Sequence, residues 1–81
     1  MPDFSSRDEA AAYAAMLTRS LRTFLADALK ASLDDSPYTA AAWKRYDGLA
    51  AEATAQGFRV TYDYGVPVVW APLDMLESLP E

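Results

Sequence analysis

Apolar residues recur with a helical period over the first third of the chain. Their spacing alternates between three and four residues, so they form one stripe along a helix. Leu25 and Leu29 widen this stripe. The spacing from Ser6 to Glu9 fits a capping box, in which the serine hydroxyl accepts the Glu9 backbone N–H. The pattern predicts a helix over about residues 7–33, with a stripe made of Ala14, Leu17, Leu21, Phe24, Ala28 and Ala31.

A second helical pattern follows two aspartates, Ser36 and Pro37. Ser36 can cap a helix whose first residue is Pro37, because the proline nitrogen needs no hydrogen bond there. Gly57 is a natural residue after the last turn, so we expect this helix over about residues 37–56. Gly48 in its middle marks either a close crossing or a kink, since glycine costs about 1 kcal/mol relative to alanine in a helix. The short connection favours an antiparallel helical hairpin.

The last third of the chain predicts one β-hairpin, with strands over about residues 58–62 and 66–70. A three-residue loop at 63–65 turns six apolar side chains toward one face. A two-residue loop would split this set between the two faces, and a four-residue loop that pairs Val60 with Val69 stays open as an alternative. We therefore expect the following residues to face the helices: Phe58, Val60, Tyr62, Val66, Val68 and Trp70.

The same register places Arg59, Thr61, Pro67 and Val69 on the outer face of the hairpin, and Tyr64 in its loop. Exposed apolar and aromatic groups that cluster together are typical of protein interfaces. We therefore predict that these five residues bind a partner protein. Pro67 lacks the N–H that would extend the second strand, so the first strand keeps the open edge. A second copy of the chain is expected to pair there.

Residues 73–79 can form one or two helical turns closed by Pro80, and residues 1–5 are expected to be a flexible N-terminus. The chain of 81 residues is thus predicted to be a single α+β domain, with a helical hairpin, a β-hairpin and a short C-terminal helical turn. A domain of this size buries only about 60% of the surface that its unfolded chain exposes. Alanine supplies much of the apolar content and adds little buried area, so we expect a homodimer.

The chain is acidic, with a formal net charge of −5. This balance argues against nucleic acid as a partner, because affinity for phosphates comes from lysine and arginine. The last third carries four acids against Arg59, so an acidic inhibitor that imitates nucleic acid is an alternative function. The sequence shows neither a signal peptide nor a membrane span, which predicts a cytoplasmic protein. An alanine-rich, lysine-poor composition is typical of a GC-rich bacterial or phage genome.

Catalytic chemistry has few candidate residues here. The chain has no histidine and no cysteine, the usual zinc ligands, and histidine is also the commonest general base near neutral pH. Asp34 and Asp35 could hold a hard cation but are best explained as a solvated turn, and Asp63 as an ordinary loop residue. We therefore expect no catalytic residue, metal or cofactor, and a non-catalytic protein-interaction module with an unidentified partner. A second alternative is a small-ligand pocket lined by Trp43, Tyr46, Phe58 and Trp70.

Overall fold

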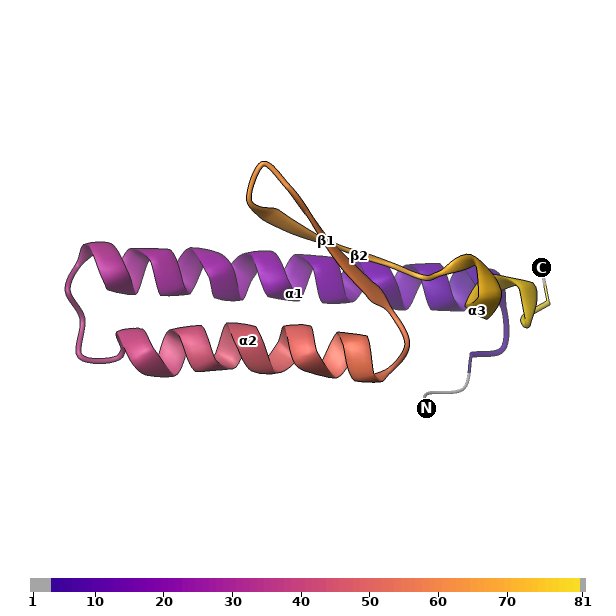
Figure 1. Cartoon of the computed structure of the whole chain (residues 1–81), viewed down its shortest axis with the longest axis horizontal. Coiled ribbons are helices and arrows are strands. Elements are labelled where there is room, and N and C mark those ends of the chain that lie inside the picture. The colour runs from indigo at the N-terminus through magenta and orange to yellow at the C-terminus, as the bar shows by residue number, and fades with distance from the viewer. Residues whose placement is uncertain (1–3, 81) are drawn as a thin grey trace.

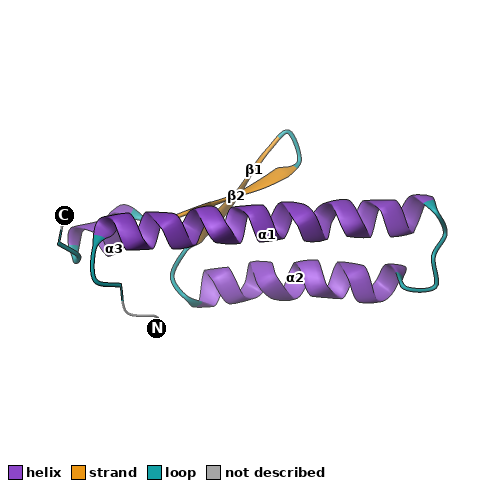
Figure 2. Cartoon of the chain, turned by 180° about the vertical axis from the view of Figure 1, so that it is seen from behind, coloured by secondary structure: helices purple, strands orange, loops and turns teal. Residues whose placement is uncertain are grey.

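Two antiparallel helices carry a two-stranded sheet and a short third helix (Figure 1). The computed structural model describes residues 4–80. The hairpin lies across one side of the helix pair, and the view from behind shows it on the far side of the first helix (Figure 2). The order is the predicted α+β arrangement, α-α-β-β-α. Its elements are α1 (Arg7–Leu33), α2 (Thr39–Ala55), β1 (Arg59–Asp63), β2 (Val66–Trp70) and α3 (Leu73–Glu77).

The predicted serine cap forms at the start of α1, but the Glu9 carboxylate reaches back to Ser5 and not to the Ser6 N–H of a full capping box. The N–H of Glu9 donates to Ser6 Oγ over 3.2 Å, and the Glu9 carboxylate accepts from Ser5. Phe4 packs against Tyr13 and Phe58, with ring centroids 5.4 and 5.9 Å away. Of the N-terminal segment predicted to be flexible, residues 1–3 lie outside the described residues, whereas residues 4 and 5 make these defined contacts.

Both long helices end in a Schellman motif, in which a left-handed residue turns the chain back. Gly57 takes this position after α2, with φ of 97°, as its place in the sequence predicts. Asp35 takes it after α1, with φ of 53°. The N–H of the following residue bonds back into the last turn in both motifs, over 2.9 Å at Ser36 and 3.0 Å at Phe58. The acidic turn therefore has a structural role in ending α1.

The second helix begins at Thr39, two residues later than predicted. Ser36 is not its cap. The Ser36 hydroxyl accepts the N–H of Tyr38 over 3.1 Å, and the Ser36 carbonyl accepts the Thr39 hydroxyl over 2.7 Å. These bonds favour a turn at residues 36–38 over a first helical turn. Gly48 faces open space, with no atom within 4 Å of the position that a Cβ would take, so the close-crossing interpretation is wrong.

The core lies between the two long helices and the inner side of the hairpin. The predicted stripe of α1 is buried at Ala14, Leu17, Leu21 and Ala28, whereas Leu29 is half exposed. Leu21 is fully buried, at the centre of this packing. The buried cluster consists of Ala14, Leu17, Leu21, Tyr46, Ala53, Phe58 and Val69.

The C-terminal segment is attached to the beginning of α1. Arg7 Nε donates to the carbonyls of Leu76 and Leu79, over 2.8 and 3.2 Å. The backbone N–H of Arg7 donates to the Pro80 carbonyl over 2.9 Å. These bonds join the N-terminal N–H and the first side chain of α1 to carbonyls in and after the last turn of α3. The segment after the hairpin therefore packs back on the bundle.

The hairpin register differs from the favoured prediction. Asp63 pairs with Val66, so the loop has two residues, Tyr64 and Gly65, with φ of 53° and 80°. Positive φ at both loop positions is characteristic of a type I′ turn, whose twist matches that of the strands. The predicted three-residue loop is wrong, because Tyr64 adopts the left-handed conformation as well as Gly65. The remaining pairs are Arg59–Trp70, Val60–Val69, Thr61–Val68 and Tyr62–Pro67.

In this register, the side chains of β2 that were predicted to face outward face the helices, and those predicted to face the helices point outward. Val69 is 4% exposed and Pro67 is fully buried, whereas Trp70 is 56% exposed. The prediction that Pro67 and Val69 lie on the outer face is therefore wrong, and so is the prediction that Trp70 faces the helices. The physical reason is that β2 runs directly against α1, where the Val69 N–H bonds to Thr18. Compact side chains fit this close approach better than an indole ring.

Candidate interaction edge of the hairpin

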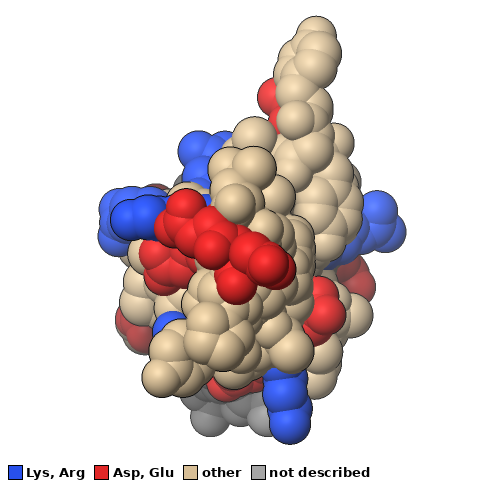
Figure 3. All heavy atoms as spheres, turned by 90° about the vertical axis from the view of Figure 1, so that its left-hand side faces the viewer, with Lys and Arg blue, Asp and Glu red and all other residues tan. Residues whose placement is uncertain are grey.

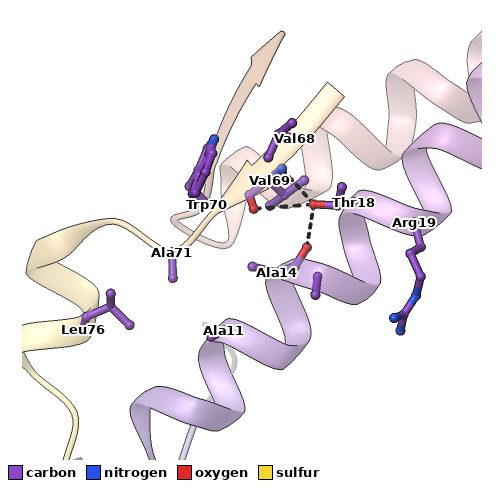
Figure 4. Close-up of a pocket in the computed structure, with 10 residues that line it drawn as sticks. Ala11, Ala14, Thr18, Arg19, Val68, Val69, Trp70, Ala71 and Leu76 are labelled. Carbon is purple, nitrogen blue, oxygen red and sulfur yellow. Dashed lines mark hydrogen bonds between the residues drawn. The ribbon is translucent and has the colours of Figure 1, made fainter. Parts of the chain in front are cut away.

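Groups of α1 close the outer edge of β2. The N–H of Val69 donates to Thr18 Oγ1 over 2.9 Å (Figure 4), and Arg22 Nε donates to the Pro67 carbonyl over 3.2 Å. Thr18 and Arg22 lie one turn apart on the same face of α1, so they follow the strand. Pro67 itself has no N–H to offer. A further strand therefore cannot add to this side of the sheet.

The outer edge of β1 is unpaired. Residues that flank a two-residue hairpin loop form a hydrogen-bonded pair, and such pairs alternate with non-hydrogen-bonded ones along the strands. Asp63 and Val66 are the flanking pair, so the N–H and C=O groups of Val60 and Tyr62 point away from β2. Within residues 4–80, these four groups have no hydrogen-bonding partner. The edge thus presents two donors and two acceptors in strand geometry.

The outer face of the hairpin adjoins this edge. Arg59 and Thr61 are exposed on it, and Tyr64 is fully exposed in the loop beside it. Trp70 Nε1–H donates to Thr61 Oγ1 over 2.7 Å. The hairpin projects from the bundle as an arm with few charged side chains (Figure 3). Sequence reasoning missed Trp70 and Val66 as exposed residues of this face, and a type I′ reading of the Tyr-Gly pair would have placed them there.

Side chains attach β1 to the bundle on its inner face. The hydroxyl group of Tyr62 lies beside that of Tyr46, on α2, and contributes to the raised pKa of Tyr46. Tyr46 is 7% exposed. Burial is the first cause that raises the pKa of Tyr46 from 10.0 to about 12, and the neighbouring Tyr62 side chain is the second. The strand is thus held by a side-chain contact while its backbone edge stays accessible.

An apolar groove of about 500 Å³ lies between α1, β2 and α3 (Figure 4). Alanines of α1 line one side, and Trp70 and Leu76 lie across from them. The aromatic pocket considered from the sequence has a different lining. Trp70 alone of its four residues borders this groove, because Tyr46 and Phe58 are buried in the core and Trp43 packs edge-on against Tyr46.

Acidic side chains gather at the end of the bundle where α1 and α2 join (Figure 3). Asp34 and Asp35 are exposed in that loop. No cluster of three or more histidine, cysteine or acidic side chains suited to a metal ion occurs in the described part of the chain. Likewise, none of the helices between residues 4 and 80 has the length and apolar character needed to cross a membrane.

Comparison with known proteins identifies no relative. No protein-family model matches the chain, and neither curated proteins nor solved structures give a significant match. The class of the protein therefore rests on its fold and edge alone. It is an α+β domain whose β-hairpin has one closed and one open edge.

Proposed function

We propose that this protein is a non-catalytic interaction module that binds another protein chain by strand addition at β1. In this mode an extended segment pairs with an exposed sheet edge, so main-chain hydrogen bonds give affinity and side-chain positions give specificity. The unpaired backbone groups of Val60 and Tyr62 are the observation that carries the proposal. An exposed edge is otherwise a liability, since it invites aggregation.

The one-sided protection of the hairpin supports this function. Thr18, Arg22 and Pro67 together block the edge of β2, whereas β1 contains no proline and no bulge in its pairing. Tyr64 is exposed in the loop, and Trp70 is exposed on the outer face, where its indole N–H bonds to Thr61 of β1. Tyrosine and tryptophan are among the residue types that contribute most binding energy at protein interfaces. A partner strand on β1 would extend the face that carries the Trp70 ring.

An acidic inhibitor is the weaker alternative. Its carboxylates would have to form one surface that imitates a row of phosphates. Asp63 lies at the loop end of the hairpin, whereas Asp74 and Glu77 belong to α3 near the other end (Figure 1). This separation favours strand addition over imitation of nucleic acid.

A small-ligand function has one specific observation in its favour, the apolar groove beside Trp70. Its volume of about 500 Å³ lies in the range of ligand pockets. A ligand bound there would raise the melting temperature, because it binds the native state alone. A thermal-shift screen of apolar compounds should therefore give hits on the wild type that disappear in Ala11→Leu, whose side chain fills the groove. A screen without such hits removes this alternative.

Peptide binding followed by NMR tests strand addition. Peptides selected from a random library on the wild type should perturb the amide signals of Val60 and Tyr62 more than that of Val69. The Val60→Pro variant should lose these peptides, because proline removes an edge donor without breaking a bond of the hairpin. Thr23→Val, on the exposed side of α1, is the matched control and should bind as the wild type does. Equal binding by Val60→Pro would refute the proposal.

A further inference from the structure

The sequence of β1 complements itself in antiparallel pairing. The strand begins with Arg59 and ends with Asp63, and Thr61 lies at its centre. A two-fold axis beside Thr61 places Arg59 of one copy opposite Asp63 of the other, and symmetry repeats the contact. Opposite charges that face each other across strands stabilise the pairing, and like charges destabilise it. The charges of β1 therefore favour a second β1 strand in this register.

The free backbone groups fit the same register. Val60 of one copy then faces Tyr62 of the other, and both have N–H and C=O groups that point outward. Each such pair exchanges two hydrogen bonds, so the two symmetric pairs form four. A register shifted by one residue would place the outward N–H and C=O groups of one strand opposite residues whose own groups point back to β2. A shift by two would place Arg59 or Asp63 opposite Thr61, where neither finds an opposite charge.

We infer that the partner of β1 is a second copy of this chain, paired antiparallel about Thr61. The inference rests on the proposed function and names its partner. It yields a four-stranded sheet in the order β2-β1-β1-β2. Both outer edges of that sheet are β2 edges, which Thr18 and Arg22 close. Assembly therefore stops at a symmetric dimer and does not continue into a filament.

A charge-exchange experiment tests the register. Arg59→Asp alone sets acid against acid at two symmetric positions, and Asp63→Arg alone sets base against base. Each variant should raise the dimer dissociation constant about ten-fold or more in sedimentation equilibrium. An equimolar mixture of the two variants regains both opposite-charge contacts and should form heterodimers as tight as the wild-type dimer. Lys44→Asp, at an exposed position of α2, controls for the change in net charge.

A cysteine at the two-fold axis gives a second, spatial test. The chain has no cysteine of its own. Thr61 faces its own copy in a non-hydrogen-bonded pair, where Cα atoms lie about 4.5 Å apart, within the range of a disulfide. Thr61→Cys should therefore form a disulfide-linked dimer under mild oxidation. Tyr64→Cys, also exposed but three residues from the axis, should stay unlinked under the same conditions.

Three results distinguish this inference from the function on which it rests. A wild-type chain that sediments as a monomer at high micromolar concentration overturns the self-pairing. The self-pairing is also overturned if the wild type dimerises but the charge variants leave the dissociation constant unchanged and Thr61→Cys forms no disulfide. The dimer interface then lies elsewhere. In either case the proposed function can still hold. It holds if selected peptides perturb the amide signals of Val60 and Tyr62, because β1 then binds another protein. Circular dichroism of each variant separates loss of the dimer from loss of the fold.

Discussion

The edge of β2 is closed by α1, whereas the edge of β1 is open, although both strands belong to one hairpin. Thr18 accepts the backbone N–H of Val69, Arg22 donates to the Pro67 carbonyl, and Pro67 has no N–H of its own. On the other side, Tyr46 of α2 lies beside the side chain of Tyr62, and no helical group bonds to the outer backbone edge of β1 within residues 4–80. Two helical side chains are thus enough to close a strand edge. The fold applies this protection to one strand and leaves the other available.

The closed edge also fixes the sheet on the bundle. A two-stranded hairpin is marginal by itself in water and needs cover on one face. Val69 and Pro67 supply that cover by packing into the core beside α1. The open edge has no such structural role, so changes there should affect association more than folding. Substitutions on each side of the hairpin can test this difference.

The largest effect is expected where β2 meets the core. Val69→Asp places a carboxylate without a partner at a position that is 4% exposed, and should lower the free energy of unfolding by about 4 kcal/mol or more. Val66→Asn, on the exposed face of the same strand, is the control and should cost less than about 1 kcal/mol, because it adds no charge opposite Asp63. Urea denaturation measures both. Equal losses would mean that the two faces of β2 are assigned wrongly.

The side-chain attachment of β1 should appear at high pH. The pKa of Tyr46 is raised from 10.0 to about 12, so the unfolded chain loses this proton at a lower pH than the folded one. This group therefore leaves stability unchanged below pH 10.0 and lowers it between pH 10.0 and about 12. The slope is about 1.4 kcal/mol per pH unit at most.

The measurement is the free energy of unfolding across that pH range. Tyr46→Phe should remove the slope, because it removes the titrating hydroxyl. Tyr38→Phe changes a tyrosine that is mostly exposed, and should leave the slope as it is in the wild type. An unaltered slope in Tyr46→Phe would show that its hydroxyl is not buried against Tyr62.

Removal of the Thr18 hydroxyl tests the closed edge itself. Thr18→Val keeps the side-chain shape but leaves the Val69 N–H without its acceptor, so the free energy of unfolding should fall by about 1–2 kcal/mol. Thr23→Val is the matched control. Its hydroxyl bonds to the Arg19 carbonyl over 3.0 Å, as that of Thr18 bonds to Ala14 over 2.9 Å, but it makes no hydrogen bond to β2. An equal loss of unfolding free energy in both variants would mean that the bond from Val69 to Thr18 does not stabilise the edge of β2.

The smallest effect concerns the loop that sets the register. Tyr64 holds a left-handed conformation, with φ of 53°, which asparagine tolerates better than other residues with a side chain. Tyr64→Asn should therefore be more stable than Tyr64→Ala by about 0.5 kcal/mol in thermal or urea unfolding. Both variants remove the same fully exposed ring. Equal stability of the two would argue against a type I′ turn.

The first helix was predictable from sequence because its signals are local. Ser6 caps the start, a stripe of period 3.6 fills the interior, and the chain turns away after Leu33. The hairpin register was not predictable in this way. It depends on Tyr64 adopting a left-handed conformation and on the fit of β2 against α1, and the second is a tertiary effect that overrides the apparent alternation of apolar residues.

The candidate site shows the same division. Pro67 occupies a non-hydrogen-bonded position in the predicted and the observed register alike, so it indicated which strand keeps the free edge. The closing bonds from Thr18 and Arg22 depend on how α1 is rotated against β2, which no local pattern reports. Trp70 was placed on the wrong face for the same reason. Sequence thus located the edge but not the side chains around it.

Hydrogen exchange of the hairpin amides distinguishes the open edge of β1 from the closed edge of β2. In dilute protein, the amides of Val60 and Tyr62 should exchange rapidly, whereas that of Thr61, bonded to β2, and that of Val69, bonded to α1, should be protected. A rise in protein concentration should slow exchange at Val60 and Tyr62 and leave Val69 unchanged. Protection at Val60 and Tyr62 equal to that at Thr61 in the dilute monomer would contradict the open edge. If these two amides exchange equally fast at every protein concentration, the result would contradict pairing of β1 with a second copy.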